Sequence, residues 1–329
     1  MNYKKYAIVD LHLHLDGSLS AKAIIDVANK EGIKLPTKDE NELNKFLMVP
    51  ENCKSLNEYL ECFSLPNLVL QSKQGLQICT LELLERLAKD GLKYVEIRMA
   101  PQLSTDKGLS QDEVVDTLIK TCKIAEKNGI FSNLILCMMR GNDTKQKNLE
   151  TIEVAKKFLG KGVVALDLAG AEGLFPNEMF EEEFKLINDL QIPLTIHAGE
   201  ASGADSVKSA LKYGACRIGH GIHSIEDELV LDELKDKNIT LEVCPKSNLD
   251  TKTISKYEDL PLKRFMQLGI KVSINTDDMT VSNTTLAKEY ETLTKLGFNE
   301  KELQQFARNS IEASFASKSI KDYLYNFIK

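Results

Sequence analysis

The sequence lacks the features of a membrane, nucleic-acid-binding or fibrous protein. Its 329 residues contain no run of basic residues and no apolar run near the roughly 20 residues of a membrane-spanning helix. The 42 Lys and Arg against 49 Asp and Glu give a net charge of −7, which argues against nucleic acid or an anionic membrane as the main partner. Gly (18) and Pro (8) are ordinary in number, which excludes collagen-like and low-complexity classes. We therefore expect a soluble globular protein with a large buried core.

The cysteines show no sign of a disulfide framework. There are seven, an odd number, and none forms a CxxC pair. Several lie in apolar-periodic segments, where a free thiol packs as a small hydrophobe. The N-terminal residues contain no long apolar segment typical of a secretory signal, because His12 and His14 interrupt it. These observations predict reduced thiols and a cytoplasmic location.

Short β-branched runs alternate with amphipathic helical patterns along the chain. The eight predicted strands lie near residues 6–12, 94–99, 132–138, 163–168, 193–197, 216–220, 240–244 and 271–276. Each is almost continuously apolar, which is typical of a parallel sheet buried on both faces. Eight such units predict an α/β fold closed into a (β/α)8 TIM barrel. The alternative, a doubly wound sheet, would need a glycine-rich phosphate turn where this chain has DGSLS.

Helices are predicted between the strands. The clearest is 111–127, where Ser110 and Glu113 suggest a capping box and Gly129 closes the helix. The others lie near 146–158, 178–190, 204–213, 226–237 and 261–268.

The first and second strands are separated by roughly 80 residues, where a barrel unit averages about 30. We therefore predict a helical insertion after the first strand, with helices near 20–31, 56–63 and 76–89. Long insertions at such a position often form lids over the site. Residues 299–329 are predicted to form a C-terminal helical extension. Because no linker or internal repeat divides the chain, a single domain over residues 1–329 is expected.

Histidine is scarce, and its positions are informative. The chain has only five, each at or just beyond the C-terminal end of a predicted strand. They are His12, His14, His197, His220 and His223. Because the C-terminal ends of barrel strands carry the active site, this clustering predicts a site built from several imidazoles.

Two motifs offer metal ligands. His12 and His14 lie two residues apart on one strand, point to the same side and suit a divalent metal. Asp10 shares their parity but lies deeper, where we expect a structural hydrogen-bonding role. His197 in HAGE offers a third imidazole, and Glu200 of the same motif lies within reach of a bound substrate.

The motif GHGIH follows the sixth predicted strand. Gly219 and Gly221 allow a close approach of the backbone. Between them, His220 is a candidate general base because imidazole titrates near neutral pH. For His223 we expect a structural role.

The number of metal ions follows from two further motifs. In NTDD, Asp277 or Asp278 could supply an anionic ligand, and strand parity does not decide between them. The fourth strand ends in DLAGAE, without a lysine that could be carboxylated to bridge two ions, so one ion is predicted. The missing CxxC excludes the zinc deaminase architecture with a His/Cys/Cys site.

Together the motifs HLHLDGSL, DLAG, HAGE, GHGIHSIED, EVCPKSN and SINTDD resemble those of the adenosine deaminase family of the amidohydrolase superfamily. They occur in that family's order, and SLNEYLECF, LKYVEIRMAPQ and NSIEASF add to the likeness. The four ligands that the resemblance implies for one zinc ion are His12, His14, His197 and Asp277. It also implies that His220 positions or deprotonates the metal-bound water, and that Glu200 gives its proton to N1 of a purine.

The resemblance also implies the contacts of the substrate. Asp278 would contact N7, the backbone N–H of Gly170 would face N3, and Asp16 would hold the ribose 5′-hydroxyl, with His14 also at the substrate. Three residues at helical spacing in the insertion would cover the sugar, with plain core packing as the alternative: Leu56, Tyr59 and Phe63.

The implied activity is the hydrolytic deamination of adenosine and 2′-deoxyadenosine to inosine and 2′-deoxyinosine, with release of ammonia, in purine salvage. The expected partner is therefore a small-molecule purine nucleoside, and the sequence leaves the oligomeric state open. A barrel deaminase acting on adenine, aminodeoxyfutalosine or an AMP-like nucleotide is the alternative, followed by a binding homologue without catalysis. Two departures from the family's pattern, Ala171 and Met279, are expected to border the purine pocket and leave the exact substrate preference open.

Overall fold

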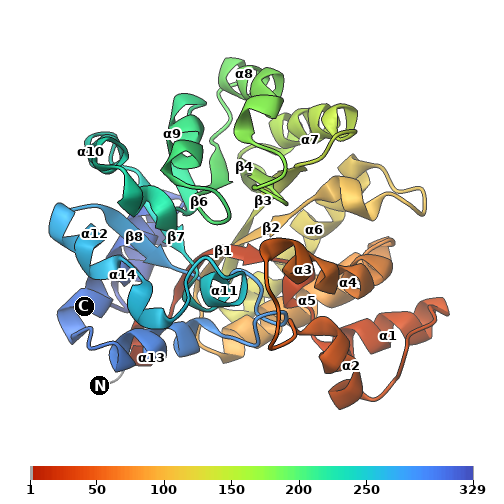
Figure 1. Ribbon diagram of the computed structural model, residues 1–329. Helices are drawn as coiled ribbons and strands as arrows, with labels where there is room; N and C mark the ends of the chain where they lie inside the picture. The colour runs from red at the N-terminus through yellow and green to blue at the C-terminus, as the bar shows by residue number, and fades with distance from the viewer. Residues whose placement is uncertain (1–2, 329) are drawn as a thin grey trace.

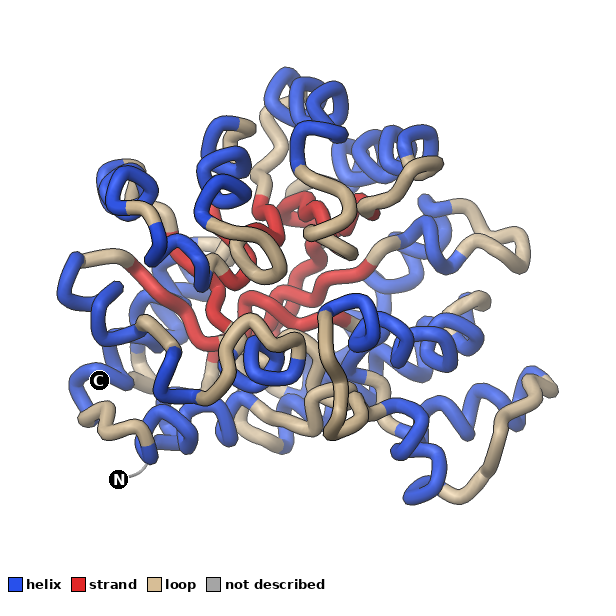
Figure 2. The backbone as a smooth tube through the Cα atoms, viewed as in Figure 1, coloured by secondary structure: helices blue, strands red, loops and turns tan. Residues whose placement is uncertain are grey.

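The computed structural model describes residues 3–328, with eight parallel strands at its centre and helices around them (Figures 1 and 2). The strands are β1 (Val9–His14), β2 (Tyr94–Met99), β3 (Phe131–Met139), β4 (Val163–Ala169), β5 (Thr195–Ala198), β6 (Arg217–His220), β7 (Thr240–Val243) and β8 (Lys271–Ile274). They pair in the order β1–β2–β3–β4 and β5–β6–β7–β8. The predicted parallel α/β barrel is confirmed.

Two seams join these sheets into a closed barrel. At the first, the N–H of Leu166 donates to the carbonyl of Pro193 at 2.9 Å. At the second, His14 N–H donates to Asp277 O and Asp277 N–H donates to His12 O, both at 2.8 Å. The second seam fastens the end of β1 to the segment after β8, so the backbone itself brings three of the expected metal ligands together.

Most strand ends differ from the prediction by one to three residues, and two of these differences have a clear cause. β1 begins three residues later, because residues 3–6 form a 3₁₀ turn in which Ala7 N–H donates to Lys4 O. β8 ends at Ile274 instead of residue 276, because the chain changes partner there. Asn275 N–H still donates to Val243 O of β7, whereas the N–H of Asp277 donates to β1.

Helices surround the barrel and bury their apolar faces against it. Those between successive strands are α6 (Gln111–Ala125), α7 (Lys145–Phe158), α8 (Glu181–Asp189), α9 (Ala204–Lys212), α10 (Glu228–Asp236), α11 (Pro245–Asp250) and α12 (Leu262–Leu268). The capping box of α6 is present, with reciprocal bonds between Ser110 and Glu113. Gly129, at φ 80°, ends the 3₁₀ turn that continues the helix. α11 was not predicted, because its six residues are too few to show a helical period.

The insertion between β1 and β2 is mainly helical. It comprises α1 (Ala21–Glu31), α2 (Glu40–Leu47), α3 (Leu56–Tyr59) with the 3₁₀ turn Leu60–Phe63, α4 (Ser64–Val69) and α5 (Lys73–Lys89). In Figure 1, α3 lies beside the mouth of the barrel, whereas α1 and α2 extend away from it. Two of these helices were not predicted, because α2 buries only Leu43 and Leu47 and α4 contains Pro66.

The C-terminal region adds three helices to the outside of the barrel. They are α13 (Leu286–Lys295), α14 (Glu300–Ala313) and α15 (Lys318–Tyr325). The last two confirm the helical extension, whose final residue, 329, lies outside the described residues. One cluster of buried apolar side chains runs from Tyr6 to Ile328. The single domain stays a prediction, and its residues 1–2 and 329 lie outside the described part of the chain.

Two further findings concern membranes and thiols. Within the described residues, none of the helices has the length and apolar character needed to cross a bilayer. All seven cysteines are described as free thiols, and all except Cys216 are buried.

Candidate metal centre and active site

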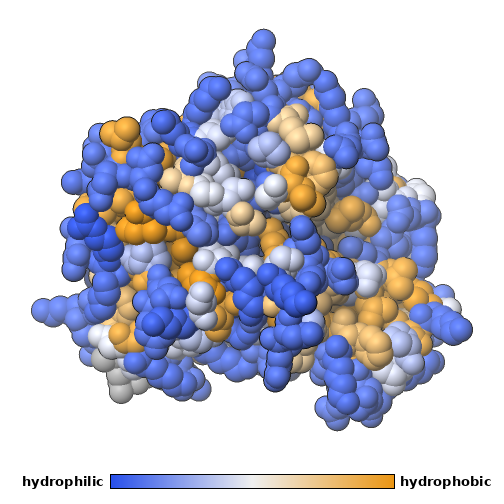
Figure 3. Space-filling model, viewed as in Figure 1, coloured by the Kyte–Doolittle hydropathy of each residue, from blue (hydrophilic) through white to orange (hydrophobic). Residues whose placement is uncertain are grey.

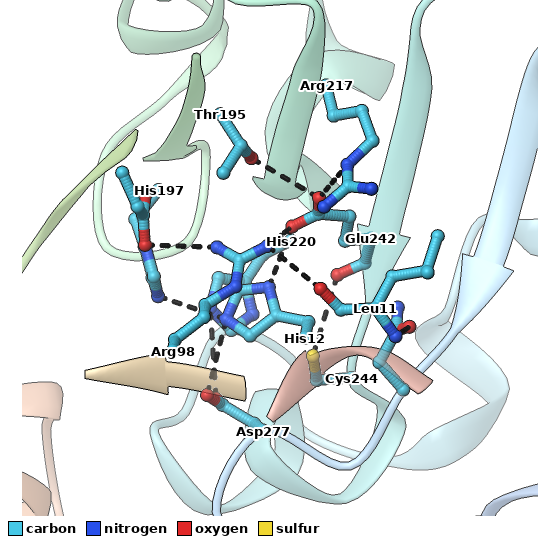
Figure 4. Close-up of polar contacts among 12 residues, drawn as sticks. Leu11, His12, Arg98, Thr195, His197, Arg217, His220, Glu242, Cys244 and Asp277 are labelled. Carbon is cyan, nitrogen blue, oxygen red and sulfur yellow. Dashed lines mark hydrogen bonds and ion pairs between the residues drawn. The ribbon is translucent and has the colours of Figure 1, made fainter. Parts of the chain in front are cut away.

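Four side chains converge at the C-terminal end of the barrel, and Figure 4 labels three of them, His12, His197 and Asp277. Nε2 of His12 lies 3.0 Å from Nε2 of His197 and 3.3 Å from Oδ1 of Asp277. Nε2 of His14 lies 3.2 Å from Nε2 of His197 and 3.4 Å from the same oxygen. A tetrahedral zinc ion with ligands at about 2.0–2.1 Å has neighbouring ligands about 3.3 Å apart. The four atoms therefore have the spacing of a tetrahedral metal site.

The outer ring nitrogens support the same conclusion. Nδ1 of His12 lies 2.9 Å from Oε2 of Glu242, and Nδ1 of His197 lies 2.9 Å from Oδ2 of Asp167. Burial opposes ionisation of Asp167, but His197 and Arg98 hold its pKa well below the usual value. A carboxylate that accepts the Nδ1 proton turns the lone pair of Nε2 towards the centre. Facing lone pairs repel unless a cation lies between them, so this donor set fits a metal ion.

Behind the ligands lies a buried ionic network that the sequence analysis missed. Arg98 bridges Asp167, at 3.0 Å, and Glu242. Nε of Arg217 donates to Glu242 at 2.6 Å, and its NH1 lies 2.7 Å from Glu96. The signal was present in YVEIRM, where Glu96 and Arg98 share the same parity in an otherwise apolar strand.

Glu200 and His220 form a potential acid–base pair. Nε2 of His220 lies 3.5 Å from Oε2 of Glu200. Neither this nitrogen nor Oε1 of Glu200 has a hydrogen-bond partner among the described residues. Burial lowers the pKa of His220 well below its usual value, against the opposing charge of Asp277. Burial and the charges of Asp277 and Glu172 raise the pKa of Glu200 well above its usual value. The surroundings thus favour the neutral imidazole of His220 and the protonated carboxyl group of Glu200, which lie next to each other.

The loop that carries Glu200 is held by one carboxylate. Glu172 is 2% exposed and accepts hydrogen bonds from four consecutive backbone N–H groups, at 2.7–3.2 Å, and from a hydroxyl group. The donors are Gly199, Glu200, Ala201, Ser202 and the Ser206 side chain. The sequence motifs do not single out Glu172, because the N–H groups that donate to it lie in another motif.

A cavity of about 220 Å³ opens over this cluster. The predicted substrate-binding and covering residues on its wall are His14, Asp16, Leu56, Tyr59, Phe63, Gly170 and Asp278. Leu60, Leu103 and Met139 add apolar surface. Of the described residues that line the cavity, none is lysine or arginine. In the space-filling view, apolar side chains are also visible over the insertion beside the barrel mouth (Figure 3).

Several residues lie outside the cavity wall. Asp10 accepts hydrogen bonds from the backbone of His12, at 3.2 Å, and from the Thr276 hydroxyl, at 2.7 Å, which is a structural role. His223 pairs with Glu226 at 2.7 Å, away from the cavity. The expectation that Ala171 and Met279 border the pocket is wrong. Met279 packs into the main apolar cluster, and the carbonyl of Ala171 accepts turn hydrogen bonds from the following residues.

Comparison with known proteins agrees with this geometry. The model of the family described as "Adenosine deaminase" matches residues 8–329. An adenosine deaminase of Haemophilus ducreyi is 46% identical over 99% of this chain and 96% of its own length. One from Clostridium botulinum is 44% identical over 100% of this chain and 99% of its own.

The chain belongs to the adenosine deaminase family. It is therefore a hydrolase, and the family that the sequence motifs predicted is confirmed. Among solved structures, an adenine deaminase from Arthrobacter aurescens matches with a TM-score of 0.87 and 29% identity, over 98% of this chain and 97% of that one. An Arabidopsis N6-mAMP deaminase has a TM-score of 0.86 at 24% identity, over 100% of this chain and 99% of its own, and supports the fold alone.

Proposed function

We propose that this member of the adenosine deaminase family hydrolyses adenosine and 2′-deoxyadenosine to inosine and 2′-deoxyinosine, with release of ammonia. The observation that carries the proposal is the placement of Glu200 and His220, 3.5 Å apart, beside four candidate metal ligands in one cavity. The surroundings raise the pKa of Glu200 and lower that of His220. The relatives at 44–46% identity, which carry the name adenosine deaminase over nearly the whole length, support this substrate class.

We assign zinc to the cluster of His12, His14, His197 and Asp277, because imidazole nitrogen and carboxylate oxygen at tetrahedral spacing suit this ion. When bound, zinc would supply the Lewis acidity that lowers the pKa of water to about 7. Metal binding would also neutralise the repulsion between the converging nitrogen lone pairs.

In the proposed reaction, water adds to C6 of the purine, N1 takes up a proton, and the amino group leaves as ammonia. His220, with its free Nε2, accepts a proton of the attacking water and passes it to the amino group, which leaves as ammonia. Glu200 donates its proton to N1, which requires the protonated form that burial favours, and it recovers a proton from the C6 hydroxyl as the carbonyl group forms. Asp278 at N7 and the backbone of Gly170 at N3 would orient the ring. The apolar wall formed by the insertion would exclude bulk water.

We expect one zinc ion per chain in the active protein. Elemental analysis of purified enzyme should give a stoichiometry near one, and removal by a chelator should abolish turnover until zinc is restored. Asp277→Ala should lose metal more readily, because it removes the anionic ligand, whereas the exposed Asp26→Ala should retain it. Two stoichiometric ions, or none in active protein, would contradict the assignment.

The cavity wall favours a nucleoside over a nucleotide. No lysine or arginine among its described residues is available to pair with a phosphate group. Asp16 lines the same cavity, and although burial raises its pKa to about 6, it is largely ionised at neutral pH. A carboxylate accepts a hydrogen bond from a ribose hydroxyl but repels a 5′-phosphate.

We therefore expect adenosine and 2′-deoxyadenosine to be the best substrates in a panel of 6-aminopurine compounds. Adenine and AMP should be at least about tenfold poorer in kcat/KM, since a hydrogen bond to a charged group contributes about 1.5–3 kcal/mol. Asp16→Ala should reduce the difference in kcat/KM between adenosine and 5′-deoxyadenosine, whereas Asp26→Ala should leave this difference unchanged. Faster turnover of AMP or adenine by the wild type would favour the alternative barrel deaminases.

A further inference from the structure

Tyr59 lies at the junction between the insertion and the purine end of the cavity. Its side chain is 1% exposed, and it forms part of the cavity wall. Its hydroxyl donates to Oδ2 of Asp278 at 3.1 Å and lies 2.8 Å from Oγ of Ser282. Because a phenol has one hydrogen, the Ser282 hydroxyl is then the donor to Tyr59. One oxygen of Asp278 is thus engaged by a residue more than 200 positions away in sequence.

The other oxygen of Asp278 is held differently. Oδ1 is buried and has no hydrogen-bond partner among the described residues. It lies against Gly17, where an added Cβ would come within 1.7 Å of it. The carbonyl of Gly17 also accepts from the N–H of Thr280, at 3.0 Å, which fixes the segment after Asp278. The missing side chain at residue 17 therefore makes room for the carboxyl group in this orientation.

The insertion is anchored to the same segment. Val49 N–H donates to the carbonyl of Val281 at 2.9 Å. Val281, Tyr59, Cys53 and Cys62 form a small buried cluster separate from the main core. The Tyr59 hydroxyl is thus placed by packing as well as by its hydrogen bonds.

We propose that Tyr59 is a positioning residue for purine recognition: its hydroxyl donates to Oδ2 of Asp278, so that Oδ1 is left to carry the carboxyl proton and donate it to N7 of the ring. The inference rests on the proposed function, in which Asp278 contacts N7, and it adds the insertion to the determinants of specificity. With phenylalanine at residue 59, Oδ2 would lose its donor. The carboxyl group could then rotate about its terminal torsion, which has a broad, soft profile.

The test uses two nucleosides that cannot be deaminated, because both lack the N1 that must take up a proton. 1-Deazaadenosine keeps N7, and 1,7-dideazaadenosine replaces it with carbon. In the wild type, the inhibition constant of the second should be about tenfold higher, the value of one well-placed hydrogen bond. In Tyr59→Phe the ratio of the two inhibition constants should fall to about twofold or less. Most of this change should come from a higher inhibition constant for 1-deazaadenosine.

Two matched variants separate positioning from general loosening. Tyr290 is fully buried and its hydroxyl has no partner among the described residues, so Tyr290→Phe should keep the wild-type ratio. Ser282→Ala leaves the bond between Tyr59 and Asp278 in place and should keep the ratio within about twofold of the wild type.

The outcomes are distinct. A Tyr59→Phe enzyme that retains the tenfold ratio, or that binds both nucleosides more weakly by the same factor, overturns the positioning role. A wild-type ratio near one, with normal turnover of adenosine, overturns the inference but leaves the proposed function intact. A wild type that does not deaminate adenosine overturns the proposed function itself.

Discussion

Glu200→Gln should retain the fold and the metal but lose about 10²–10⁴-fold in kcat, the usual contribution of general acid catalysis. The amide has nearly the shape of the acid, but it cannot release a proton to N1, so charge would develop on the ring uncompensated. The backbone N–H of residue 200 would still donate to Glu172, so the loop should stay in place. Ultraviolet absorbance during turnover measures the loss in kcat, and elemental analysis measures whether the metal is retained.

The pH dependence gives a second measure of the same role. Activity requires the protonated form of Glu200, so wild-type kcat should fall as the pH rises through its raised pKa. That alkaline limb should be absent in Glu200→Gln. Exposed Glu153→Gln is the control and should behave as the wild type. Near-normal turnover in Glu200→Gln would mean that another group protonates N1.

The residues of the candidate site were accessible from the sequence because each lies in a short motif at the end of a strand. His12 and His14 lie two residues apart on β1, and HAGE and GHGIH begin in the last two residues of β5 and β6. Once eight strands are arranged as a parallel barrel, their C-terminal ends meet without further information. The placement of these residues around one cavity therefore follows from local patterns plus topology.

The supporting contacts were not accessible in the same way, because each joins distant parts of the chain. Arg98 and Glu242 are 144 residues apart, and Tyr59 and Asp278 are 219 apart. Strand parity indicates that a side chain points inward, but not which partner it meets across the barrel. The wrong placement of Ala171 and Met279 has the same origin, since proximity to a motif in sequence does not decide on which side of the wall a residue lies.

The predicted ends of β1 and β8 were wrong where a turn or a contact with another strand overrides the strand propensity of the residues. Residues 6–8 have a strand-like composition, yet the backbone there turns before β1 begins. At the seam between β8 and β1, the backbone after Asn275 stops pairing with β7 and pairs with β1 instead. This second departure is functional, because it places Asp277 beside His12 and His14 in a backbone conformation with φ 62°.

Arg98→Met should lower the free energy of unfolding by about 3–5 kcal/mol, the cost of leaving buried charges without a partner. Arg98 is fully buried and joins Asp167 to Glu242, the carboxylates behind His197 and His12. Methionine fills much of the volume but supplies no positive charge and no donor to the carbonyl of Leu11. Urea titration of the metal-loaded protein measures the loss, and metal affinity should fall by about 10–100-fold as both imidazoles lose orientation.

Two comparisons make this expectation specific to the buried network. The exposed Arg264, which pairs with Glu228 at 3.5 Å on the surface, should cost less than about 1 kcal/mol when changed to methionine. Arg98→Lys keeps the charge but lacks the planar guanidinium group that pairs with both carboxylates. Its free energy of unfolding should therefore lie between those of Arg98→Met and Arg264→Met. If Arg98→Met were as stable as Arg264→Met, the metal and Arg217 together would have to compensate Asp167 and Glu242. Removing the metal from Arg98→Met should then unfold it at far lower urea than the wild-type apoprotein, because only Arg217, which pairs with Glu242, would remain to balance the two carboxylates.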